Sequence, residues 1–75
     1  MNEYTVLLTW DAEASVWVAE NDDIPIALES GSFDTLIERV RHTAPEILHE
    51  NGKPADVFLN FITHRREKAY QDGRV

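Results

Sequence analysis

Acidic side chains gather at two points near the start of the chain, where they suggest metal-dependent hydrolysis. Asp11 and Glu13 lie in one polar segment, and Glu20, Asp22 and Asp23 lie in or beside a second. Nuclease chemistry of the ribonuclease-H type requires several carboxylates that converge on two metal ions about 4 Å apart. Both segments have the composition of turns, where solvated acidic residues are the usual case. We therefore do not expect an enzyme, and a residual metal-dependent nuclease is the less favoured alternative.

A second candidate ligand set is formed by His42, Glu46 and His49, which share one helical face at spacings of four and three. Such spacing can hold a metal ion when the helix is straight. Pro45 lies between these residues, and the same face is opposite an apolar stripe, so a solvated polar face is the favoured interpretation. The chain has no cysteine, and its serines lie in turn or cap positions, which argues against nucleophilic catalysis. We therefore expect neither a metal nor another cofactor.

The elements that position these residues begin with strands. From Tyr4 to Trp10, apolar residues at every second position alternate with Thr5, Leu7 and Thr9, which is the period of a β-strand. A polar connection leads to a second β-rich run over 16–19, so the pair is predicted to form a hairpin. After the breaker Asn21 to Asp23 and Pro25, residues 26–29 are predicted to form a short third strand.

A helix of about five turns is predicted between Ser32, a good N-cap, and Gly52, a typical stop. One face of this segment is apolar at helical spacing. Its members are Phe33, Leu36, Ile37, Val40, Ala44, Ile47 and Leu48. Because Pro45 removes a helical hydrogen bond, we expect a kink or two helices joined near Thr43. Residues 57–62 alternate again and are predicted to form the last strand.

The predicted fold is therefore α+β, with a βββαβ element order. One helix, either straight or kinked at Pro45, packs on one face of an antiparallel sheet. Residues 1–68 are expected to form a single domain, and residues 69–75 a frayed tail. With 75 residues and no disulfide, stability must come from one small core or from oligomerisation, and the open sheet edges favour a homo-oligomer. The start of the chain has no basic segment of a signal peptide and no long apolar run, so we expect a cytoplasmic protein without membrane attachment.

Charge is unevenly distributed along the chain, whose formal net charge is −7. Residues 1–38 contain acidic side chains but no Lys or Arg, and most of the basic residues follow His42. An acidic surface repels phosphate backbones and attracts basic proteins. The pattern predicts a basic protein partner, and a surface charged only for solubility is the alternative.

Several segments resemble the HicB-like antitoxin domains. The resemblance rests on Tyr4 to Trp10, on the run Val16, Trp17, Val18, Ala19 and Glu20, on Asp22 to Pro25, and on Glu29 to Asp34. The stretch Leu36 to Gly52, with Pro45 and Glu46 in mid-helix, is most similar to a short, uncharacterised bacterial branch of that superfamily. One difference is Ile26, which stands where family members usually have glycine. The resemblance implies a partial ribonuclease-H-like fold, in which three antiparallel strands carry one helix and a fourth strand is added.

For function, the resemblance implies neutralisation of a toxin, because HicB-type domains bind HicA, a small basic ribonuclease, and cover its active face. A partner-binding site is expected at two aromatic and four acidic residues. They are Trp10, Asp11, Trp17, Glu20, Asp22 and Asp23. For the tryptophans, packing in the core is the favoured interpretation and an interface is the alternative. After Lys68 too few residues follow for the DNA-binding element of many HicB proteins, so no direct DNA binding is expected. The second hypothesis is an orphan homo-oligomeric domain, structural or regulatory, without a toxin partner.

Overall fold

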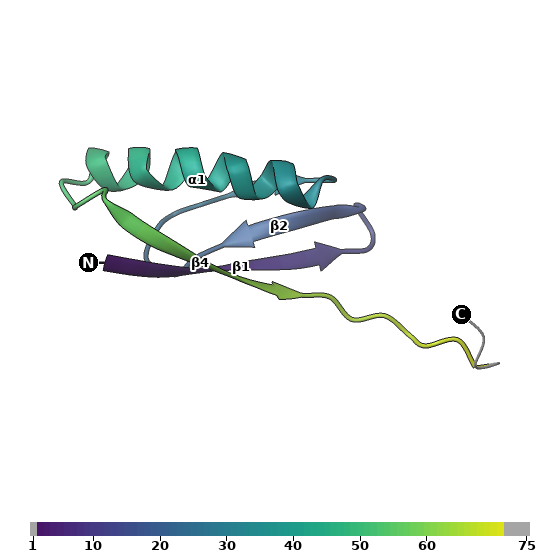
Figure 1. Ribbon diagram of the computed structural model, residues 1–75. Helices are drawn as coiled ribbons and strands as arrows, with labels where there is room; N and C mark the ends of the chain where they lie inside the picture. Colours follow the sequence, from purple (N-terminus) through teal and green to yellow (C-terminus); the bar gives the residue numbers. More distant parts are fainter. Residues whose placement is uncertain (1, 72–75) are drawn as a thin grey trace.

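The computed structural model describes residues 2–71, which form four strands and one helix (Figure 1). Along the chain these are β1 (Asn2–Asp11), β2 (Val16–Glu20), β3 (Leu28–Ser30), α1 (Phe33–Glu50) and β4 (Val57–His64). The strands form one sheet in the order β3-β2-β1-β4. The helix lies along one face of this sheet. The predicted α+β fold and its βββαβ order are confirmed.

Strands β1 and β2 form the predicted antiparallel hairpin, in which Trp10 pairs with Trp17 and Leu7 with Glu20. The turn between them is held by Asp11, whose Oδ1 accepts hydrogen bonds from the backbone N–H groups of Glu13 and Ala14 at 3.1 and 3.3 Å. This is an Asx turn, so Asp11 has a local structural role. Strand β3 pairs antiparallel with β2 over three residues, which start two positions later than predicted.

The fourth strand departs from the predicted antiparallel sheet, because β4 pairs parallel with β1, with Asn2 opposite Val57 and Thr9 opposite His64. The reason is the length and direction of α1. This 18-residue helix starts at the end of the sheet where β1 finishes and spans about 27 Å. It therefore returns the chain to the end where β1 begins, and β4 can only run in the same direction as β1. The sheet is mixed.

Helix α1 begins as predicted, with the Ser32 side chain accepting a hydrogen bond from the Thr35 N–H at 3.3 Å. It ends at Glu50, and Gly52 with φ 68° completes the stop by donating to the His49 carbonyl at 3.1 Å. The prediction of one helix is confirmed, and the alternative of two helices joined near Thr43 is wrong, because α1 runs through Pro45 without interruption. Within residues 2–71 no helix is long and apolar enough to cross a membrane.

The helix is continuous because its apolar stripe is buried on both sides of Pro45. Leu36, Val40, Ala44 and Leu48 are almost completely buried, at intervals of four residues. Burying a leucine side chain stabilises a fold by about 1.5–3 kcal/mol, and the cost of an internal proline is about 3 kcal/mol. Burial of the turn after Pro45 therefore offsets most of that cost.

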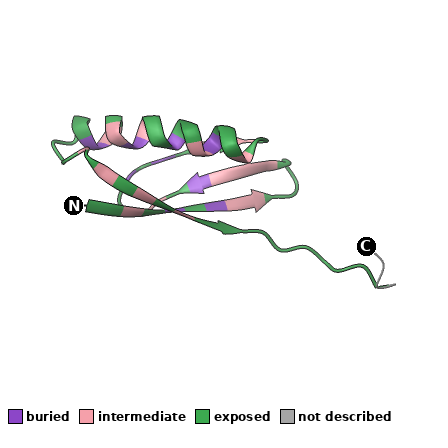
Figure 2. Cartoon of the chain, viewed as in Figure 1, coloured by how far each residue is buried: buried purple, intermediate pink, exposed green. Residues whose placement is uncertain are grey.

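The core lies between this stripe and the helix-facing side of the sheet (Figure 2). The sheet contributes Val6, Leu8 and Ala19, which are 0 to 1% exposed. The connection between β2 and β3 adds Ile24 and Ile26, also buried. Ile26 was predicted to start a strand, but it packs into the core from a loop.

After His64 the chain leaves the sheet and projects from the body of the domain (Figure 1). Residues 65–71 are all exposed, including Tyr70 at 78%. The predicted frayed tail covered residues 69–75, of which 72–75 lie outside the described residues. The described part therefore contains a compact body and an extended basic segment, residues 65–71, which we call the tail.

Replacing Leu36 by Ala is expected to lower the free energy of unfolding by about 2–5 kcal/mol, because Leu36 is completely buried between helix and sheet. Urea denaturation followed by far-UV circular dichroism measures this change. Glu46→Ala, on the exposed side of the same helix, is the control and should change stability by less than about 0.5 kcal/mol. Equal stability of the two variants would contradict the assignment of the core.

Candidate functional site

The residues predicted to bind a partner lie in three separate places. Trp10 and Trp17 face the helix at the hairpin end of the sheet, as their pairing and their half-buried state indicate. Asp11 is at the turn of the same hairpin. Glu20, Asp22 and Asp23 lie at the opposite end of β2 and line a groove. The structure thus brings the last three residues together and pairs the two tryptophans, but it separates these two groups.

The two tryptophans belong to an aromatic cluster that closes the hairpin end of the core. Their rings meet edge to face with centroids 5.3 Å apart, and Trp17 contacts Phe33 in the same manner at 5.0 Å. The guanidinium of Arg65 lies over the Trp10 ring, 4.2 Å from its centroid. Such a cation–π contact contributes roughly 0.5–1 kcal/mol at an exposed site. Both tryptophans are half-buried in this packing, and Trp17 contacts the core.

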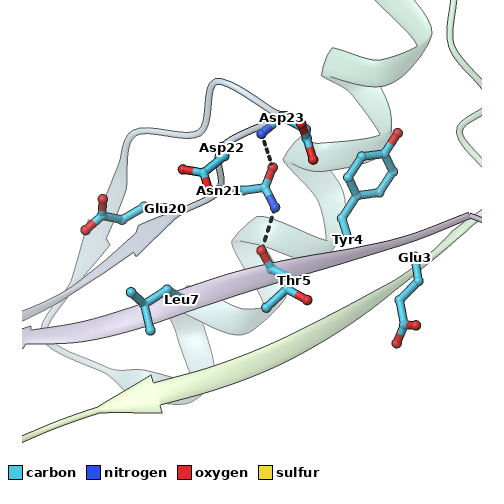
Figure 3. Close-up of a pocket in the computed structure, with 8 residues that line it drawn as sticks. All are labelled: Glu3, Tyr4, Thr5, Leu7, Glu20, Asn21, Asp22 and Asp23. Atoms are coloured by element: carbon cyan, nitrogen blue, oxygen red, sulfur yellow. Dashed lines mark hydrogen bonds between the residues drawn. The ribbon is translucent and has the colours of Figure 1, made fainter.

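An acidic groove of about 370 Å³ opens beside the first half of β1 (Figure 3). Eight residues line it, and we call this feature the acidic groove. They are Glu3, Tyr4, Thr5, Leu7, Glu20, Asn21, Asp22 and Asp23. Four of these side chains are carboxylates, and none is basic. The groove can therefore accept cationic groups through charge-assisted hydrogen bonds.

The groove exists because β2 is shorter than β1. Pairing between these strands stops at Leu7 and Glu20, so the start of β1 has no partner strand on that side. Asn21 partly replaces the missing strand, since its Nδ2 donates a hydrogen bond to the backbone carbonyl of Thr5 (Figure 3). The chain then turns away from β1, and its carboxylates are left beside an open stretch of backbone.

Residues 21–27, which join β2 to β3 and border the groove, form a segment that we call the acidic loop. This loop is held in place from two sides. The Asn21 Oδ1 accepts hydrogen bonds from the N–H groups of Asp23 and Ile24, both at 2.7 Å. Ile24 is completely buried, and its carbonyl accepts from the Ile26 N–H at 2.7 Å. Asp22 and Asp23 are exposed on this anchored backbone. A fixed loop loses little conformational entropy when a partner binds.

The groove continues into the side of the sheet opposite α1, which we call the outer face. Alternation along the strands assigns it the following residues: Glu3, Thr5, Leu7, Thr9, Asp11, Val16, Val18, Glu20, Glu29, Phe58, Asn60, Ile62 and His64. Its largest exposed apolar side chains are Leu7 at 38%, Ile62 at 49% and Phe58 at 62%. The ionisable groups in this set are four carboxylates and one histidine. The outer face combines exposed apolar side chains on β1 and the edge strand β4 with carboxylates, a combination complementary to a basic surface.

The other candidate ligand set, His42, Glu46 and His49, is exposed on α1 away from the sheet, as expected for a solvated face. Within the described range 2–71, no three His, Asp or Glu side chains are placed to hold a metal ion.

Sequence reasoning missed five residues that line the acidic groove besides the predicted carboxylates: Glu3, Tyr4, Thr5, Leu7 and Asn21. Leu7 carried the clearest signal, because an apolar residue on the otherwise polar second face of the first strand indicates a second contact surface. Asn21 was identified only as a strand breaker. Its bond to Thr5 joins residues sixteen positions apart and has no local sequence signal.

Comparison with known families identifies the chain. A model of a domain of unknown function, DUF1902, matches residues 3–71, which is nearly the whole sequence. The chain belongs to the DUF1902 family. No protein of curated function matches it.

A solved structure supports the fold. The hypothetical protein TTHA1013 of the extremely thermophilic bacterium Thermus thermophilus is 35% identical and superimposes with a TM-score of 0.76. The match covers 91% of this chain and 100% of that chain. The four-stranded sheet with one helix is thus shared with a relative of known structure, and neither description names an activity.

Replacing Asn21 by Ala is expected to loosen the acidic loop, because it removes both acceptor bonds and the link to Thr5. Amide hydrogen exchange at Asp23 and Ile24 should become at least about tenfold faster, with a loss of about 1–3 kcal/mol in unfolding free energy. Asn21→Asp keeps the acceptor oxygen and should leave the Ile24 amide protected. Unchanged exchange in Asn21→Ala would contradict the role given to this side chain.

Proposed function

We propose that this chain is a protein-binding module that captures a small basic protein through the acidic groove and the adjoining outer face. The observation that carries the proposal is the concentration of Glu3, Glu20, Asp22 and Asp23 around one groove without a basic residue in its lining. Such a field attracts basic surfaces and raises the rate of encounter. The exposed apolar side chains nearby supply the contacts that slow dissociation.

The resemblance to HicB-like antitoxins gives the proposal its specific form. In that form, the partner is a HicA-type ribonuclease in the cytoplasm, and this chain covers its active face. A ribonuclease binds RNA phosphates with basic side chains, and fixed carboxylates compete with phosphates for the same groups. Inhibition then needs no catalytic residue and no cofactor in this chain.

A second candidate is an orphan domain that associates only with itself. The observation in its favour is the exposed apolar edge strand β4, with Phe58 and Ile62 on its outer face. Both candidates are binding modules, and they differ in whether a basic partner exists.

A pull-down of the tagged chain from a lysate of its own host tests the first candidate. The variant Glu20→Gln/Asp22→Asn/Asp23→Asn removes three charges from the acidic groove. We expect it to bind a small basic ribonuclease about 3- to 150-fold more weakly than the unmodified chain at low salt, since each of three charged contacts contributes roughly 0.2–1 kcal/mol. Retention by the unmodified chain should fall as salt shortens the screening length to about 10 Å at 0.1 M.

The control variant Glu13→Gln/Glu38→Gln/Glu46→Gln removes the same charge at exposed positions outside the acidic groove. It should retain the ribonuclease like the unmodified chain, and the purified chain should stop RNA cleavage by the recovered enzyme at equal molar amounts. Equal loss in both variants would contradict the groove as the binding site, because net charge alone would then explain retention. Recovery of only the chain itself would overturn the antitoxin proposal and favour the orphan domain.

A further inference from the structure

Strand β4 is apolar on both faces although it lies at the edge of the sheet. Val57, Leu59 and Phe61 face the helix side, whereas Phe58 and Ile62 face outward. Strands with near-continuous apolar sequence are typical of positions buried on both sides. Within residues 2–71, β4 pairs only with β1, so its other edge offers free backbone N–H and C=O groups. A long apolar edge of this kind pairs readily with another strand.

The helix leaves this edge open. It packs mainly on β2 and β3, and a groove of about 370 Å³ separates it from β4. Seven residues line the groove: Arg41, Pro45, Ala55, Val57, Phe58, Leu59 and Phe61. As a result Leu59 and Phe61 are only half-buried, in contrast to Val6 and Leu8 on the neighbouring strand. An added strand would cover both side chains.

We propose that β4 pairs antiparallel with β4 of a second copy, which joins two four-stranded sheets into one. A two-fold axis makes this pairing self-complementary, so one register describes both halves. With Asn60 on the axis, Phe58 lies opposite Ile62 of the partner subunit and Leu59 opposite Phe61 of the partner subunit. A shift of two residues in either direction would place Phe58 or Ile62 opposite a polar residue. Apolar cross-strand pairs are stabilising, so the register centred on Asn60 is favoured.

The basic tail supports a second copy as the occupant. Continued past His64, this register carries the first tail residues of each chain along residues 53–56 of the other, which connect the end of α1 to β4. Arg66 and Lys68 then approach Glu50 and Asp56 of the partner subunit, at the helix end that favours positive charge. In the single chain these basic residues are exposed, and the tail projects beyond the sheet in the direction of β4 (Figure 1).

The absence of cysteine makes a direct test possible. Asn60→Cys places the only thiol of each subunit on the axis, where opposed Cα atoms are about 4.5–5.5 Å apart and within disulfide range. We expect the purified variant to form a disulfide-linked dimer under mild oxidation. Thr5→Cys is the matched control: it lies next to Asn60 on the outer face, one strand further in, and should not cross-link.

Sedimentation equilibrium of the unmodified chain measures its mass in solution and tests the dimer independently of cross-linking. We expect twice the monomer mass of 8.6 kDa, and Phe58→Asp should weaken self-association by at least about tenfold. Phe58 is 62% exposed, so Phe58→Asp should leave the fold of the single subunit intact. At a protein concentration low enough for both proteins to be monomeric, the variant and the unmodified chain should unfold at the same urea concentration. A monomer at every concentration, or equal cross-linking of Asn60→Cys and Thr5→Cys, would overturn the proposal. Both tests use the chain alone, so their outcome is independent of binding to a basic protein.

Discussion

The structure depends on β1, the strand that joins the antiparallel hairpin to the parallel edge strand. It pairs antiparallel with β2 and parallel with β4, and its side chains Val6 and Leu8 are completely buried against the helix. The parallel pairing requires a helix long enough to return the chain to the start of β1. The 18 residues of α1 meet this requirement, and Pro45 is accommodated because the helix cannot end earlier and still bury Leu48.

The same arrangement explains which surfaces stay open. One helix covers one side of the sheet, so the outer face has no cover within the described residues. The unequal lengths of β1 and β2 create the acidic groove, and Asn21 fixes the loop that carries its carboxylates. The position of α1 over β2 and β3 leaves β4 with an open edge. The outer face and the free edge of β4 are therefore two distinct open surfaces of the sheet.

Local periodicity predicted most of the fold, because strands and the helical stripe from Leu36 to Leu48 are encoded by near neighbours. The direction of β4 could not be derived from local periodicity, since it depends on whether α1 is long enough to return the chain to the start of β1. The burial of Ile24 in a loop likewise results from a distant contact. Three residues that line the acidic groove, Glu20, Asp22 and Asp23, were predicted because acidic side chains are concentrated in that part of the sequence. The tryptophans were separated from them because the pleat turns Trp10 and Trp17 toward the helix and Glu20 away from it.

The most direct test of the central claim, that the acidic groove and outer face form the binding surface, is NMR shift mapping. The ¹⁵N-labelled chain is titrated with a small basic protein recovered in the pull-down. The account predicts that the shifts concentrate at Glu3 to Leu7, at Glu20 to Ile24 and on the outward side of β4. Shifts confined to the exposed side of α1, at Asp34, Glu38 and His42, would contradict it.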